Sequence, residues 1–112
     1  FIEGRIAGAG APAVETAQGI RLPLAGPVGQ AGQSVVYGIR PEHIDLAADG
    51  VAAEVVVVEP TGSETQLVAR IGGRDVIALF RERHQLTPGQ IVGLRPRAAL
   101  AHVFDKAGGQ RL

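Results

Sequence analysis

Few residues in this sequence have the types and spacing that phosphate binding or nucleophilic attack requires. Gly8-Ala9-Gly10-Ala11-Pro12-Ala13 matches the G-x-G-x-x-A pattern of dinucleotide-binding loops. That chemistry needs a helix opening after the second glycine, so that backbone amides face the pyrophosphate. Pro12 and the absence of helical periodicity as far as Gly19 argue against such a helix, and a loop is the better interpretation. The sequence contains neither the G-x-x-x-x-G-K-[ST] pattern of a P-loop nor the G-x-S-x-G pattern of a nucleophile elbow.

The histidines and acidic residues do not indicate a metal or acid–base site. His43, His84 and His102 are scattered, none at i, i+2 or i, i+4 from another, and the chain has no cysteine. Glu59 and Glu64 flank a turn and could approach each other, but general acid–base catalysis also needs a walled cleft that separates their pKa values. We therefore expect no catalytic, cofactor-binding or metal-binding residues in this chain.

Charge and aromatic content argue against a nucleic-acid partner. The 112 residues include 11 Lys+Arg and 11 Asp+Glu, so no global field attracts a polyanion. Aromatic residues make up 4% of the chain, and at least two of the four are expected in the core rather than on a stacking platform. The cluster Arg81-Glu82-Arg83-His84 is interpreted as a solvated loop.

The elements that must position any site are predicted to be short strands. With 16 glycines and 7 prolines, helix signals are weak everywhere. Strands are predicted over residues 1–7, 19–24, 34–40, 51–58, 64–71, 75–80, 91–94 and 99–104, with 44–46 as an extension after a bend. Turns are predicted at 48–50, at Gly72-Gly73 (type I′) and at 87–90 (type II). This pattern predicts an all-β barrel or sandwich.

Three segments, in matching order and spacing, resemble one family over nearly the whole chain. Tyr37-Gly38-Ile39-Arg40-Pro41-Glu42-His43-Ile44 resembles a signature of the accessory domains that follow the nucleotide-binding domain in ABC importers of the maltose/glycerol-phosphate type. Val57–Thr65 resembles the segment that follows it in that family. His102–Asp105 with Gly109–Leu112 resembles the closing segment, and Phe1–Gly4 resembles the opening one.

The resemblance implies an OB-fold-like (TOBE) small β-barrel with additional strands, spanning residues 1–112 as a single accessory domain. It implies a non-catalytic regulatory and dimerisation domain of a sugar importer's ATP-binding subunit, coupled to ATP-driven carbohydrate uptake. ATP and Mg would belong to the parent's ATPase domain, whose motifs are missing here. The chain begins at Phe1 and lacks Met, so we expect a piece of a longer protein. The implied location is cytoplasmic, peripheral to the inner face of the membrane.

The implied partners are the protein's own ATPase domain, a second copy, transmembrane permease subunits through the parent, and a regulatory protein. Candidate interface or regulatory residues are Arg40, Pro41, Glu42, His43, Glu59, Gly62, Ser63, Glu64 and Thr65. Pro41 forces an extended conformation on Arg40, which we expect to form a bidentate pair with a carboxylate such as Glu59 or Glu64. The alternative function is a small-ligand (oxyanion or sugar) binding barrel that uses Arg40, Ser63 and Thr65.

Overall fold

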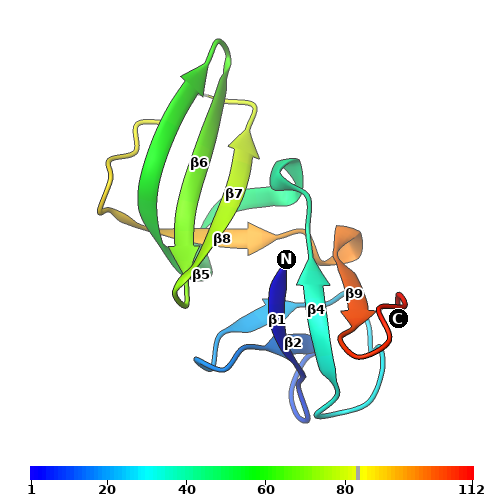
Figure 1. Cartoon of the computed structure of the whole chain (residues 1–112). Helices are drawn as coiled ribbons and strands as arrows, with labels where there is room; N and C mark the ends of the chain where they lie inside the picture. Colours follow the sequence, from blue (N-terminus) through cyan, green and yellow to red (C-terminus); the bar gives the residue numbers. More distant parts are fainter. Residues whose placement is uncertain (83) are drawn as a thin grey trace. The chain divides into compact units, whose positions relative to one another are not determined.

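The computed structural model describes residues 1–82 and 84–112, and nearly all of its regular structure is antiparallel strand (Figure 1). The elements in chain order are β1 (Ile2–Ile6), β2 (Ala13–Glu15), β3 (Arg21–Pro23), β4 (Ser34–Gly38), the 3-10 turn η1 (Pro41–His43), β5 (Ile44–Thr61), β6 (Glu64–Ile71), β7 (Arg74–Phe80), β8 (Ile91–Pro96), the 3-10 turn η2 (Ala98–Leu100) and β9 (His102–Asp105). The predicted all-β class is confirmed.

The strands form two open sheets, ordered β3-β2-β1-β4-β9 and β7-β6-β5-β8. Among the described residues neither order returns to its first strand, so two sheets stand where one closed barrel was expected. The chain divides into two compact units, unit 1 (Phe1–Ile39 and Pro96–Leu112) and unit 2 (Arg40–Arg95), which are described separately below. The expectation of a single domain over residues 1–112 stays a prediction.

The predicted turn at residues 48–50 is wrong, because β5 runs through it from Ile44 to Thr61. Gly50 is a point of close backbone approach: a Cβ built there would lie 2.6 Å from the carbonyl oxygen of Leu94 on β8. A glycine inside a strand often marks such an approach, which a short sequence window does not distinguish from a turn. The predicted strands 44–46 and 51–58 are therefore parts of one long strand.

Strand β2 lies where the sequence predicted a loop. Val14, which follows the Ala/Gly/Pro-rich stretch, is fully buried and pairs with both Ile6 of β1 and Leu22 of β3. A strand of three residues flanked by Gly and Pro has no alternation long enough to be recognised. Near the C-terminus, η2 takes up the start of the predicted strand 99–104, and β9 begins at His102.

The local turn chemistry follows the sequence. Gly72 and Gly73 have φ of 55° and 81°, as a type I′ turn between β6 and β7 requires. Gly89 has φ of 90°, and the Gln90 amide donates to the Thr87 carbonyl at 3.0 Å, which confirms the type II turn.

Each unit has its own aliphatic core with one aromatic residue. In unit 1, Tyr37 is 1% exposed and its hydroxyl donates to the Pro23 carbonyl at 2.8 Å. In unit 2, Phe80 is buried with the strand residues Val55, Leu67 and Ala78. The expectation that at least two aromatic residues lie in the core is confirmed.

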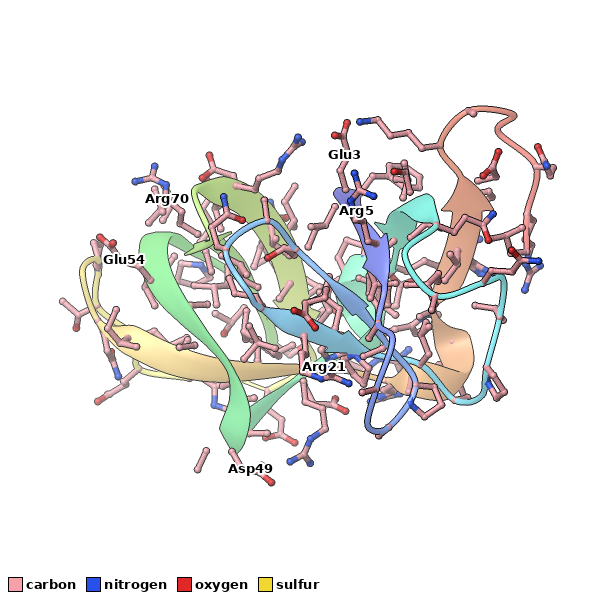
Figure 2. The ribbon with its side chains drawn as sticks, turned by 90° about the horizontal axis from the view of Figure 1, so that it is seen from below. Glu3, Arg5, Arg21, Asp49, Glu54 and Arg70 are labelled. Atoms are coloured by element: carbon pink, nitrogen blue, oxygen red, sulfur yellow. The ribbon has the colours of Figure 1, made fainter. Side chains whose placement is uncertain are left out.

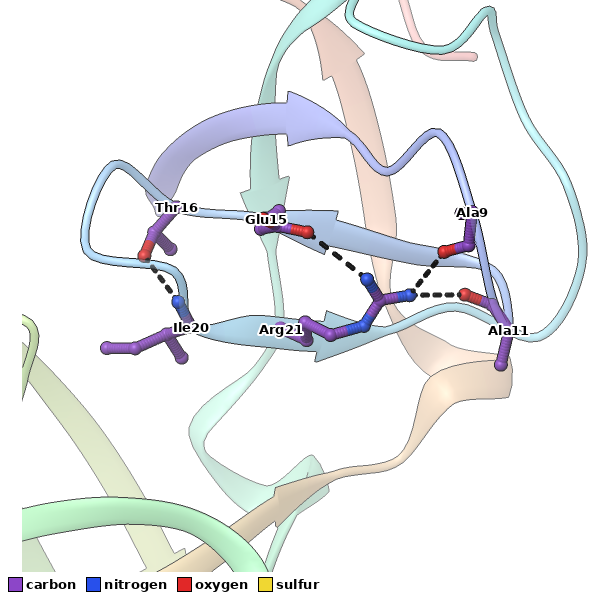
Figure 3. A network of polar contacts seen from close by, with 6 residues as sticks. All are labelled: Ala9, Ala11, Glu15, Thr16, Ile20 and Arg21. Atoms are coloured by element: carbon purple, nitrogen blue, oxygen red, sulfur yellow. Dashed lines mark hydrogen bonds and ion pairs between the residues drawn. The ribbon is translucent and has the colours of Figure 1, made fainter.

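The glycine-rich loop of unit 1 is held by a side chain rather than followed by a helix (Figure 3). The Arg21 guanidinium donates to the carbonyls of Ala9 and Ala11 at 3.0 and 2.9 Å, and pairs with Glu15 at 3.1 Å. At the other end of β2, the Ile20 amide donates to the Thr16 hydroxyl at 3.2 Å. No helix follows the G-x-G-x-x-A match: residues 8–12 form a loop, as interpreted, and Ala13 begins β2.

The C-terminal segment folds back on β9 through Asp105. The Asp105 carboxylate accepts from the Gln33 side chain at 3.0 Å and from the Gly108 amide at 2.7 Å. These hydrogen bonds, that from Gln33 first, hold the pKa of Asp105 below its ordinary value. The Lys106 amide also donates to the Ser34 carbonyl at 3.1 Å and the Leu112 amide to the Val103 carbonyl at 2.8 Å, so the segment 105–112 is tied to β4 and β9 of unit 1.

Candidate protein interface

All the candidate residues predicted from the sequence lie in unit 2, on two separate features. The first is η1, which lies beside β7. Arg40 precedes η1 with φ −75° and ψ 146°, the extended conformation predicted from Pro41. Arg40 and Glu42 are exposed, whereas Pro41 and His43 are half-buried.

The second feature is the tip of the β5–β6 hairpin, closed by Gly62 and Ser63. Gly62 has φ of 68°, and among the described residues only glycines have positive φ, which matches a type II′ turn with glycine first. Thr61 pairs with Glu64, and Glu59 pairs with Gln66. Because paired residues and alternate residues of a strand share a face, both carboxylates project from the same face of the hairpin.

Thr65 lies on the opposite face and is 2% exposed. Its hydroxyl donates to the Glu82 carbonyl at 3.0 Å and accepts from the His84 amide at 3.3 Å. The His84 ring also contacts the Phe80 ring edge-on, with centroids 5.3 Å apart. The Thr65 side chain therefore anchors the segment after β7 and is not part of the exposed surface. Arg83, in the predicted solvated cluster, lies outside the described residues.

Replacing Thr65 with Val is expected to destabilise the fold by about 1–3 kcal/mol, because the Glu82 carbonyl and the His84 amide lose their partner. Urea unfolding followed by circular dichroism measures this loss. The matched control is Thr61→Val, which removes a hydroxyl from an exposed position on the same hairpin and is expected to change stability by less than about 0.5 kcal/mol. Equal losses in the two variants would contradict the anchoring role.

Among the described residues, Arg40 forms no ion pair with Glu59 or Glu64. The three residues of the small-ligand alternative, Arg40, Ser63 and Thr65, do not form a common polar site either. Arg40 precedes η1, whereas Ser63 lies at the exposed hairpin tip. The Thr65 hydroxyl is already engaged with two backbone groups. The two described cavities, of about 200 and 230 Å³, lie in unit 1 and contain none of the predicted residues.

The face that carries Glu59 and Glu64 has a row of apolar side chains that the sequence analysis did not single out. Val57 pairs with Val68, and Val68 pairs with Ile77, so the row crosses β5, β6 and β7. Val57 is 42% and Ile77 47% exposed. We call the whole set the outer face of β5–β7; its members are Glu54, Val57, Glu59, Thr61, Glu64, Gln66, Val68, Arg70, Asp75, Ile77 and Leu79. The signal was present, because these residues alternate with the buried positions of 64–71 and 75–80.

Charged side chains border this row on both sides. Beyond it in one direction, Glu54 pairs in register with Arg70, which forms an ion pair with Asp75 at 3.4 Å (Figure 2 shows Glu54 and Arg70 on the same side of these strands). In the other direction lie Glu59 and Glu64.

No group of three or more His, Cys, Asp or Glu side chains in the described residues could hold a metal ion. Among those residues there is also no helix with the length and apolar character needed to cross a membrane. The apolar row with its charged borders has the character of a contact surface.

Comparisons with known proteins match two family models. The TOBE domain model matches residues 37–104, and the MalK OB fold domain model matches residues 1–44. The chain is 47% identical over 113 residues to the uncharacterized ABC transporter ATP-binding protein y4oS of Sinorhizobium fredii, which covers 100% of this chain and 30% of that protein.

Other relatives carry related names. The putative ATP-binding protein BAB2_0493 of Brucella abortus is 46% identical over 74 residues, 64% of this chain and 21% of that protein. The sn-glycerol-3-phosphate import ATP-binding protein UgpC of Bordetella pertussis is 38% identical over 108 residues, 88% of this chain and 30% of that protein. The chain thus spans less than a third of the length of these relatives.

Proposed function

This chain belongs to the TOBE domain family, as found in ABC transporter ATP-binding proteins, and on that premise we propose that it is the regulatory and dimerisation domain of a carbohydrate importer's ATP-binding subunit. It contributes no catalytic group of its own. ATP and Mg bind the ATPase domain of the parent, which sits at the cytoplasmic face of the membrane against its permease subunits. The import of sn-glycerol-3-phosphate, a phosphorylated polyol, named for the Bordetella relative supports a sugar or polyol substrate.

The observation that carries the proposal is an exposed apolar row beside predicted interface residues, on an open sheet face. Val57 and Ile77 stay close to half exposed within the folded chain, and Glu59 and Glu64 border them. Exposed apolar patches with polar rims are typical of protein contact sites. In the parent, such a contact surface would bring a regulator to the transporter.

Sedimentation equilibrium of the 112-residue chain at micromolar concentrations tests the dimerisation part of the proposal. We expect a reversible monomer–dimer equilibrium, because a domain of this size is only marginally able to bury its surface alone and gains stability by association. A strict monomer at the highest soluble concentration would contradict dimerisation through this domain.

Regulation is tested by comparing the parent subunit with and without residues 1–112. In the truncated subunit we expect sugar-dependent ATPase activity to persist and its modulation by regulators to be lost.

A further inference from the structure

We propose that the outer face of β5–β7 docks a partner protein whose contact surface is an apolar strip bordered by Arg or Lys side chains. This inference deepens the proposed function, since it rests on a regulatory role and specifies the chemistry of the regulator's contact surface. It commits to a heterologous protein partner and against a second copy of this chain.

The apolar part of the face has the form of a strip that a partner can cover. Val57, Val68 and Ile77 are joined by cross-strand pairing, so their side chains form one continuous row over three strands. Leu79, paired with Gln66, widens the row at its β7 end. Val57 and Ile77 are among the few large apolar side chains that stay exposed. Covering them removes apolar surface from water, which is the general driving force of association.

The charges that border the strip select its partner. Among the described residues of the paired strands, the register places four carboxylates on this face, those of Glu54, Glu59, Glu64 and Asp75, against the guanidinium of Arg70. The whole chain is neutral, so a net charge of −3 on one face is a local concentration. Arg81 is exposed and follows β7 directly. When its charge is added to the −3 of the face, the net charge is −2, so the face remains acidic.

Complementary charge across an interface raises the association rate and suppresses wrong partners. A second copy of this chain would bring a like-charged face to the strip, at an electrostatic cost. Anionic lipid headgroups and nucleic acid phosphates are repelled for the same reason. A basic-rimmed apolar protein surface satisfies both the strip and its border.

Two synthetic amphipathic helical peptides test the proposal, one with a Leu stripe bordered by Arg and one with the same stripe bordered by Glu. Each is titrated into the isotope-labelled 112-residue chain, and binding is followed by backbone amide chemical shifts. We expect the Arg peptide to shift the amides of Val57, Val68 and Ile77 and to lose affinity as salt is raised. The Glu peptide is expected to bind at least about tenfold more weakly.

Variants assign the effect to this face. Glu59→Lys with Glu64→Lys is expected to weaken the Arg peptide by about tenfold or more and to strengthen the Glu peptide. Glu42→Lys makes one such substitution on η1 of the same unit and is expected to change Arg-peptide affinity by less than about twofold. Val57→Ser with Ile77→Ser is expected to abolish binding of both peptides.

Several outcomes would overturn the proposal: equal binding of the two peptides, shifts that map to unit 1, or an unchanged affinity in the Glu59/Glu64 variant. Conversion of a dimer to a monomer by Val57→Ser with Ile77→Ser would also overturn it, because the face would then join two copies. That result would support the dimerisation proposed above, so the two proposals fail separately. If the serine variant does not fold, the lysine variant still decides between them.

Discussion

Gly93→Ala is expected to destabilise the chain by about 3 kcal/mol or more, enough to remove a large fraction of the stability of a small domain. A Cβ at position 93 would overlap the carbonyl oxygen of Ala47 and lie 3.1 Å from its carbonyl carbon and 3.2 Å from the Gly50 amide nitrogen. All three contacts are backbone atoms, so no side-chain rotation relieves them. The β5 and β8 backbones must separate, which breaks the packing of unit 2 where these two strands lie close together.

Gly26→Ala is the matched control. A Cβ there meets nothing within 4 Å, and Gly26 is not among the glycines with positive φ. We expect a change between zero and about 1 kcal/mol of stabilisation, because alanine restricts the unfolded chain. Urea unfolding of both variants gives the comparison, and similar midpoints would show that the β5–β8 approach is not as close as described.

Tyr37→Ala is expected to cost about 3–5 kcal/mol, the range for removing a buried aromatic side chain. Tyr37 is the large buried side chain of unit 1, and its hydroxyl is the partner of the Pro23 carbonyl. Tyr37→Phe keeps the ring and removes only the hydroxyl, so we expect a smaller loss of about 1–2 kcal/mol. Chemical unfolding measures both; a Phe variant as unstable as the Ala variant would assign the effect to the hydrogen bond rather than to packing.

The same residue produces a defined loss of stability at alkaline pH. Burial raises the pKa of Tyr37 from 10.0 to about 12. The folded state therefore holds the phenolic proton more tightly than the unfolded state, and this contribution is fully present below pH 10 and is lost as pH rises toward 12. The fall approaches about 1.4 kcal/mol per pH unit in that window. The chain has one tyrosine and no tryptophan, so tyrosinate absorbance reports Tyr37 alone.

Tyr37→Phe is the control for the alkaline effect, since it removes the titrating group and should flatten the dependence of the unfolding midpoint between pH 10 and 12. Lys106 is the only lysine, and its ammonium lies exposed, 3.1 Å from Glu3. Lys106→Gln separates any contribution from that ion pair. An ordinary Tyr37 titration in the folded chain would contradict the burial described here.

The local elements of this protein were predictable because their causes lie within a few residues. The alternation in 64–71 predicts β6 with its observed bounds, Gly72-Gly73 predicts a type I′ turn, and Pro41 predicts the extended backbone of Arg40. Each of these depends on the conformational preferences of neighbouring residues. The family was also predictable, because its motifs are linear segments.

The candidate interface was predicted only in part, because its members are selected by strand register. Glu59 and Glu64 were singled out from the turn they flank, yet the apolar row beside them exists only once Val57, Val68 and Ile77 are paired. Thr65 was predicted as an interface contact in the same segment. The strand alternation places Glu64 on the outer face and turns the neighbouring Thr65 into the core, where it is buried. A shift of one residue in register would exchange the two faces.

By itself, the sequence determined the all-β class, most turns and the resemblance to accessory domains of ABC importers. Only the tertiary structure decided that β5 continues through Gly50, that Val14 belongs to a strand, and that acidic side chains surround an exposed apolar strip. These features depend on pairs far apart in the chain, such as Gly50 with Leu94. Contacts at that separation are set by backbone pairing across the sheet, and no window of neighbouring residues contains both partners.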